Sequence, residues 1–205
     1  QAEELHKRES REYQHKITQY ANRKYETDPG LGDLITTQKA LRDIRVYLQN
    51  PNGVLSKDTR FDDRRALLSL REWGVDIIAL PETNRNWNKE YLRNRWKSEV
   101  QRVWRHSKVF FTSIDEPANP TAEYLQGGAC LIVTGAWASR VMVHGSDYLG
   151  RWVWATLSGK QHERTTVVTM YRPNRGSAAS GPATVWEQQR TRMRGQRRAC
   201  KPTLA

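Results

Sequence analysis

Cysteine is scarce in this 205-residue sequence, and long apolar runs are missing. The two cysteines, Cys130 and Cys200, are too few for a disulfide framework and lack the spacing of metal ligands, which favours a reducing compartment. We therefore expect an intracellular protein, and the nucleus is one compartment that fits. No run approaches the roughly 20 apolar residues that cross a bilayer, and the first residues lack a signal-peptide pattern, so we expect no membrane partner.

Basic residues, by contrast, are abundant. Lys and Arg number 34 against 22 for Asp and Glu, which gives a formal net charge of +12. Such an excess favours a polyanionic partner, because each basic group near a phosphate releases condensed counterions. Six of these basic residues lie in 186–205, where Glu187 is the only acidic residue. An Arg-rich tail on an otherwise ordinary soluble surface therefore stays open as the alternative.

The chain length fits one domain of ordinary size with a core of its own. Residues 1–33 are dense in charge with a thin apolar stripe, and the Pro and Gly residues of 28–32 end that pattern. We expect a charged helical arm or linker over 1–33, a folded domain over 34–185 and a basic, disordered tail over 186–205. Because the first residue is Gln1, we also expect a processed product or an incomplete segment.

The hydrophobic pattern predicts an α/β fold. A strand at 44–49, a helix opened by Thr59 and Asp62, and a strand at 76–80 follow one another, which implies a crossover and a parallel pair of strands. Asn88 is the predicted cap of a second helix. Further strands are expected at 108–114, 126–134, 152–158 and 165–171, the last two as a hairpin, and a short helix near residue 183.

Polar side chains follow the first two predicted strands at the point where each strand ends. Asn50 and Asn52 follow the strand at 44–49, and Glu82 follows the apolar run 77–80. Ligands of open α/β sheets collect at the carboxyl ends of strands, so these side chains should converge on one rim and offer oxygen ligands to a hard cation. The segment 50–53 is by itself also an ordinary turn sequence, and Tyr171 at a later strand end could equally serve packing.

Four segments together resemble the endonuclease/exonuclease/phosphatase superfamily, in the order and spacing of its amino-terminal part. They are Gln49-Asn50-Pro51-Asn52-Gly53, the run Asp76–Asn84, the run Gln126–Val133, and Tyr171-Arg172-Pro173-Asn174. The resemblance spans about residues 44 to 176. Within the superfamily, it is nearest to the apurinic-endonuclease-like domains of mobile elements.

This resemblance implies an incomplete four-layer α/β/β/α sandwich with mixed sheets, and hydrolysis of phosphodiester bonds with Mg²⁺ or Mn²⁺. It implies that Glu82 and Asn52 form the metal site. Glu82 would be the metal ligand, and Asn52 would hold the metal's water shell. Asn50 would orient the attacking water or a catalytic carboxylate, Tyr171 would donate a hydrogen bond to the scissile phosphate, and Asn174 would bind the substrate phosphate backbone. DNA is the expected partner ahead of RNA, and the sequence indicates no obligate protein partner.

The motifs of the superfamily's second half are missing. A G-D-x-N segment and a terminal S-D-H would supply the aspartate that activates water and the histidine that stabilises the oxyanion, yet no Asp follows Asp147 and no His follows His162. Because catalytic groups that act as a unit fail together, we expect a truncated enzyme with weak activity or none. Two alternatives stay open: a non-catalytic, basic nucleic-acid-binding remnant, and a phosphatase of inositol or sphingolipid headgroups.

Overall fold

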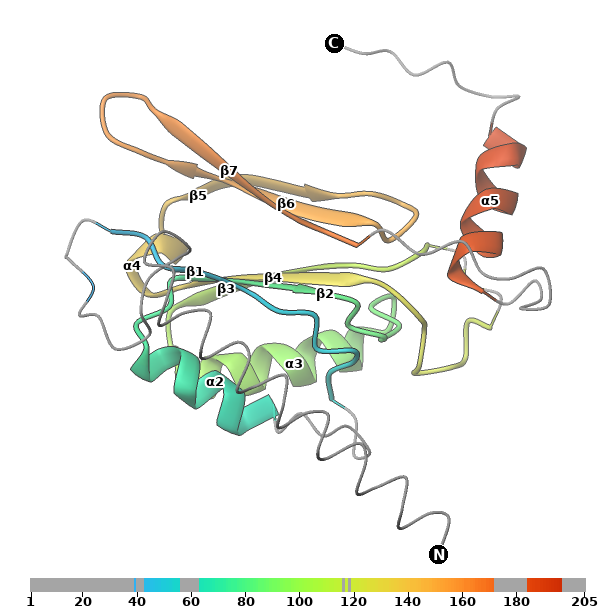
Figure 1. Cartoon of the computed structure of the whole chain (residues 1–205), viewed down its shortest axis with the longest axis horizontal. Coiled ribbons are helices and arrows are strands. Elements are labelled where there is room, and N and C mark those ends of the chain that lie inside the picture. Colours follow the sequence, from blue (N-terminus) through green and yellow to red (C-terminus); the bar gives the residue numbers. More distant parts are fainter. Residues whose placement is uncertain are drawn as a thin grey trace, which may run out of the picture. The chain divides into compact units, whose positions relative to one another are not determined.

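The computed structural model describes residues 39, 43–55, 63–115, 117, 119–171 and 184–196 (Figure 1). Apart from Lys39, these residues belong to one compact unit that runs from Leu41. Three predictions lie outside the described residues: the arm over 1–33, the helix start at Thr59 and Asp62, and the phosphate-binding role of Asn174.

The first sheet has four strands in the order β1-β2-β4-β3. The predicted parallel pair is confirmed, because β1 pairs with β2 in parallel, with Leu48 beside Ala79. Strand β4 runs antiparallel to both β2 and β3, so this sheet is mixed, as expected. The carboxyl ends of β1, β2 and β3 and the start of β4 therefore share one edge, which we call the site end. The strands are β1 (Val46–Leu48), β2 (Ile77–Pro81), β3 (Ser107–Thr112) and β4 (Ala129–Thr134).

The second sheet has three antiparallel strands, β5 (Val141–Ser146), β6 (Trp152–Ser158) and β7 (Arg164–Met170), in that order. The predicted hairpin of β6 and β7 is confirmed. Strand β5 and the short helix α4 (Gly135–Ala138) before it were not predicted. The sequence of β5 contains Gly145, which breaks a strand pattern, but a Cβ there would lie 2.8 Å from the ring of Trp154, so the close packing of the two strands requires glycine.

Two helices, α2 (Asp63–Glu72) and α3 (Glu90–Val103), pack against one face of the first sheet, and the second sheet packs against the other (Figure 1). The helical side buries Leu67, Leu92 and Trp96 almost completely. The prediction that Asn88 caps α3 is wrong. Lys89 occupies the cap position without a side-chain bond, because the Asn88 amide instead donates to the carbonyl of Ile114, at 2.8 Å.

The two sheets bury alternate residues of β6 between them. Val153, Ala155 and Leu157 face the first sheet and are at most 1 % exposed. Trp152 and Trp154 point to the opposite face of the second sheet. They alternate with the buried set, and their cross-strand partners Met170 and Val168 are 67 % and 46 % exposed. The described part of the fold therefore has a helical layer and two sheet layers.

The short helix expected near residue 183 is present as α5 (Val185–Gln196), and it extends into the segment predicted to be a disordered tail. That prediction is wrong for 186–196, because local and tertiary contacts fix the helix. Glu187 pairs with Arg190 at 2.7 Å, and the buried Gln189 donates from Nε2 to the carbonyl of Leu149, at 3.0 Å. Within the described residues, no helix is both long and apolar enough to span a membrane.

Candidate functional site

The site end brings together the side chains that follow β1 and β2. Asn50 donates from Nδ2 to Oε2 of Glu82, at 2.6 Å, across 32 positions of sequence. The Asn50 side-chain oxygen in turn accepts from the backbone N–H of Asn52, at 2.9 Å. The predicted convergence of these three residues on one rim is confirmed, and its cause is the parallel pairing of the two strands.

The backbone at this rim adopts an unusual conformation at several non-glycine residues. Asn52, Glu82 and Asn84 have φ angles of 50°, 57° and 53°. Asparagine tolerates this left-handed region, but for glutamate it is uncommon. The Glu82 carbonyl is fixed by the N–H of Gly53, at 2.9 Å. Such conformations are costly and persist where surrounding contacts impose them, which is typical of functional sites.

Tyr171 reaches the same carboxylate from the second sheet. It follows β7 directly, and its N–H donates to the carbonyl of Arg151, at 2.7 Å. Burial raises the pKa of the Tyr171 phenol, and the charge of Glu82 and a hydrogen bond to Glu82 raise it further. The phenol therefore stays protonated at neutral pH and donates to Glu82. The structure thus brings Asn50, Asn52, Glu82 and Tyr171 together, while Asn174 lies outside the described residues.

Asn84 is a residue of the site that the sequence analysis missed. It is 5 % exposed, and its Nδ2 donates to Oδ1 of Asn52, at 3.1 Å. Its own Oδ1 accepts from the N–H of Gly127, at 2.8 Å. Asn84 therefore ties the metal-site candidate Asn52 to the loop before β4. The signal in the sequence is an asparagine at the end of the run Asp76–Asn84. The sequence does not show, however, that its partner is Gly127, 43 positions away.

The glycine pair before β4 lets the backbone approach its neighbours closely. A Cβ on Gly128, whose φ is 73°, would lie 2.9 Å from the carbonyl oxygen of Thr112 and 3.2 Å from Oγ1 of Thr83. The N–H of Thr83 donates to the Gly128 carbonyl, at 3.3 Å, and the N–H of Asn84 donates to that of Gly127, at 2.8 Å. Glycine at position 128 is thus a requirement of the rim.

Two more residues of the rim were not predicted. Tyr124 is 59 % exposed, and its phenol is near enough to Tyr171 to help raise that residue's pKa. Arg85 forms an isolated bridge with Tyr124 and donates from Nε to the carbonyl of Val54. Burial lowers the pKa of this arginine, while nearby Glu123 opposes the shift. Arg85 therefore links the segments that carry Asn52 and Glu82.

The donor set determines which cation the rim could hold. Glu82 is the one carboxylate in the hydrogen-bonded cluster, and the described residues contain no group of three His, Cys, Asp or Glu side chains suited to a metal. Soft and borderline metals are therefore poor candidates for this rim. Mg²⁺ often binds through one or two carboxylates and keeps several waters, and this combination of one carboxylate with amide oxygens fits it.

No protein-family model and no curated protein matches the chain. Among solved structures, it is similar to an endonuclease/exonuclease/phosphatase family protein from Leptotrichia buccalis C-1013-b, with a TM-score of 0.46 and 10 % identity over 78 % of this chain and 64 % of that one. The human Nocturnin catalytic domain with bound sulfate gives 0.40 and 13 %, over 75 % and 59 %. The endonuclease/exonuclease/phosphatase from Beutenbergia cavernae DSM 12333 gives 0.40 and 16 %, over 77 % and 44 %.

The chain thus spans less than two thirds of the length of each of these three structures. The observed fold, with two sheets and helices on one face of the first sheet, agrees with the α/β class expected from the sequence.

Proposed function

We propose that the site end is a metal-dependent phosphodiesterase site of the endonuclease type, which binds Mg²⁺ or Mn²⁺ and a phosphate of DNA. One observation carries the proposal: a single carboxylate, Glu82, accepts hydrogen bonds from Asn50 and from Tyr171, which come from different sheets. Two neutral donors around one carboxylate leave its negative charge uncompensated, and a cation would neutralise it.

In this proposal, Glu82 is the metal ligand and Asn52, oriented by Asn84, holds the metal's waters. A bound divalent ion would polarise the phosphate oxygens and neutralise charge that develops on them. Asn50 would orient the attacking water, and the Tyr171 hydroxyl would donate to the scissile phosphate. Since the sequence has no Asp after residue 147 and no His after residue 162, we expect slow turnover at best.

The test measures binding and cleavage of duplex DNA that contains an abasic site, with and without Mg²⁺. We expect Mg²⁺ to strengthen DNA binding, and any slow cleavage under excess protein to need Mg²⁺. Both effects should disappear in Glu82→Ala. The matched control is Glu163→Ala, an exposed glutamate in the turn between β6 and β7, at the opposite end of the sheets. Cleavage that survives Glu82→Ala would contradict the proposal.

A second candidate is a non-catalytic, basic nucleic-acid-binding domain. The observation that favours it is the net charge of +12 combined with the absence, from the sequence, of the second-half catalytic motifs. Its affinity for DNA would fall steeply with salt, since binding would rest on counterion release. The same DNA-binding measurement separates the two functions, because this second one predicts indifference to Mg²⁺ and to Glu82→Ala.

A further inference from the structure

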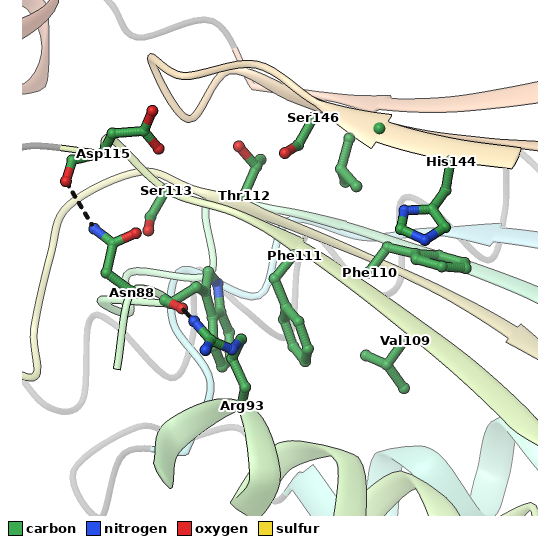
Figure 2. A pocket seen from close by; sticks show the side chains of 13 residues that line it. Asn88, Arg93, Val109, Phe110, Phe111, Thr112, Ser113, Asp115, His144 and Ser146 are labelled. Atoms are coloured by element: carbon green, nitrogen blue, oxygen red, sulfur yellow. Dashed lines mark hydrogen bonds between the residues drawn. The ribbon is translucent and has the colours of Figure 1, made fainter. Parts of the chain in front are cut away.

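A pocket of about 290 Å³ lies between the edge strands β3 and β5, apart from the cluster around Glu82. We call it the edge pocket. Its polar side includes Asn88, Ser113 and Asp115, and its other side includes Phe110 and His144 (Figure 2). Pockets for small molecules span roughly 300–1,000 Å³, so the edge pocket is the size for one ring system and too small for an oligomer or a lipid.

One buried polar atom in this pocket has no partner. Ser113 is 6 % exposed, and its Oγ makes no hydrogen bond with any described residue. An unpaired buried hydroxyl costs about 1–3 kcal/mol, so its presence needs an explanation. Ser113 lines the pocket, and Figure 2 shows its hydroxyl on the polar side near Asn88. A ligand in the pocket would satisfy this hydroxyl.

The aromatic lining favours a flat ligand. Phe111 pairs with Trp87 on the helical face of β3, with ring centroids 4.5 Å apart, and Phe110 pairs with His144 on the opposite face, at 4.4 Å. All four residues line the pocket. Aromatic rings gain about 1–3 kcal/mol per base when they stack on nucleobases, whatever the base. An aliphatic ligand would not use these π-faces.

The charged groups of the pocket favour a ligand with both donors and acceptors over a simple ion. Arg93 and Asp115 line the same pocket with opposite charge, and the Arg93 guanidinium uses one of its N–H groups on the carbonyl of Trp87. A simple ion of either sign would be attracted by one of these two side chains and repelled by the other. The Ser113 hydroxyl, the arginine and the carboxylate together offer donors and acceptors. The edge of a nucleobase carries both kinds of group in one plane.

We propose that the edge pocket binds a single nucleobase, as a free nucleoside or as an unpaired base of a nucleic-acid strand. The base stacks against Phe111, which precedes Ser113 by two residues, and its polar edge meets Ser113 and Asp115. This inference goes beyond the proposed function, because it uses no residue of the Glu82 cluster. Trp87 connects the two sites, since its Nε1 donates to Oγ1 of Thr83 at 2.7 Å, and Thr83 follows Glu82 in the chain.

The experiment is a ligand-observed NMR titration of the full chain with adenosine, cytidine and a short single-stranded DNA. We expect binding that weakens about fivefold in Ser113→Ala and in Asp115→Asn, the loss of about one hydrogen bond each. Ser113→Ala removes an unpaired buried hydroxyl, so its unfolding midpoint should stay unchanged or rise, which separates a lost ligand contact from damage to the fold. Ser139→Ala and Glu163→Gln, which change exposed side chains outside the pocket, are the controls.

Each outcome of this titration either supports or overturns the proposal of a nucleobase site. Binding of the nucleosides, weakened by both pocket variants and unchanged in Glu82→Ala, supports the proposal with a free nucleoside as the source. Binding of the DNA alone, with the same sensitivity, supports it with a strand as the source. No binding, equal binding in the pocket variants, or full competition by inorganic phosphate overturns it. Since Glu82→Ala abolishes only the Mg²⁺-dependent effects, failure of this proposal and failure of the proposed function are distinguishable.

Discussion

The two ends of the sheet sandwich contain the same unusual backbone conformation for different reasons. At the site end, Glu82 and Asn84 have positive φ and are held by partners far away in sequence, 32 to 43 positions off. At the opposite end, Gln161 and His162 also have positive φ. They belong to the β6–β7 turn, which is closed locally by the bond from the Gly159 N–H to the Glu163 carbonyl, at 2.7 Å.

We call this second region the hairpin end, residues 159–163 together with the start of α4. A local turn is formed by its own residues alone, whereas the site end forms only when four segments of the chain pack together. The comparison teaches that backbone strain marks a site when distant contacts impose it, and only a turn when neighbours do. Changes at the site end should therefore cost more stability than matched changes at the hairpin end.

The largest difference is expected between two glycines. Gly128→Ala places a Cβ 2.9 Å from a backbone carbonyl at φ 73°, so strain and overpacking together should cost about 2–5 kcal/mol. Gly135→Ala, at the hairpin end, has φ 55° and no atom within 4 Å, so only the conformational cost of about 1–2 kcal/mol applies. Urea unfolding measures both. Equal losses of unfolding free energy in the two variants would contradict the comparison.

Asn84→Ala should have the next largest effect. It removes the bond to Oδ1 of Asn52 and leaves the Gly127 N–H unpaired in a buried position, which we expect to cost about 2–3 kcal/mol. His162→Ala changes an exposed residue at a similar φ, 68°, and should stay within about 1 kcal/mol. Thermal unfolding of the two variants is the measurement, and a His162 variant that loses as much as the Asn84 variant is the contrary result.

Asn50→Asp tests the electrostatics of the site end. The substitution puts a second carboxylate where Nδ2 now donates to Glu82 at 2.6 Å, so like-charge repulsion should destabilise the fold by about 1 kcal/mol at neutral pH. Mg²⁺ should restore the lost stability by binding between the two carboxylates. The readout is the melting temperature of wild type and variant with and without Mg²⁺. A loss that Mg²⁺ leaves untouched would show that no cation binds there.

The smallest effect concerns Tyr171. Because its pKa is raised, the folded state holds the phenol proton more tightly than the unfolded chain does. The resulting stability is fully present below the unfolded pKa of about 10 and is lost as pH rises through the folded pKa. The phenolate absorbance that Tyr171→Phe removes should titrate above pH about 10. Glu82→Gln should lower that midpoint, since it removes the charge, and an unmoved midpoint would mean that the two groups do not interact.

The sequence was enough to predict the convergence of Asn50, Asn52 and Glu82. The uninterrupted apolar run of β2 identifies a buried strand, and the helix between β1 and β2 requires parallel pairing, which places the two strand ends side by side. These predictions succeeded because each depends on a local pattern combined with one rule of chain topology.

The features that were missed depend on contacts that no local pattern encodes. Strand β5 contains Gly145 because Trp154 packs over it, and the bond from Asn84 to Gly127 joins segments 43 positions apart. Asn88 is a residue type that often caps helices, yet its side-chain amide donates to the carbonyl of Ile114, 26 positions away. The extent of helix α5 was missed, because the sequence from residue 186 on has no clear apolar face. In each case tertiary contact overrode local preference.

The central claim is that Glu82 organises a divalent-cation site, and Mn²⁺ binding followed by electron paramagnetic resonance tests it most directly. The account predicts that the wild-type chain binds Mn²⁺ in competition with Mg²⁺. It also predicts that Glu82→Gln, which keeps the shape and removes the charge, weakens binding by about tenfold or more, while Glu163→Gln at the hairpin end leaves it unchanged. Wild-type affinity for Mn²⁺ in the Glu82→Gln protein would contradict the claim.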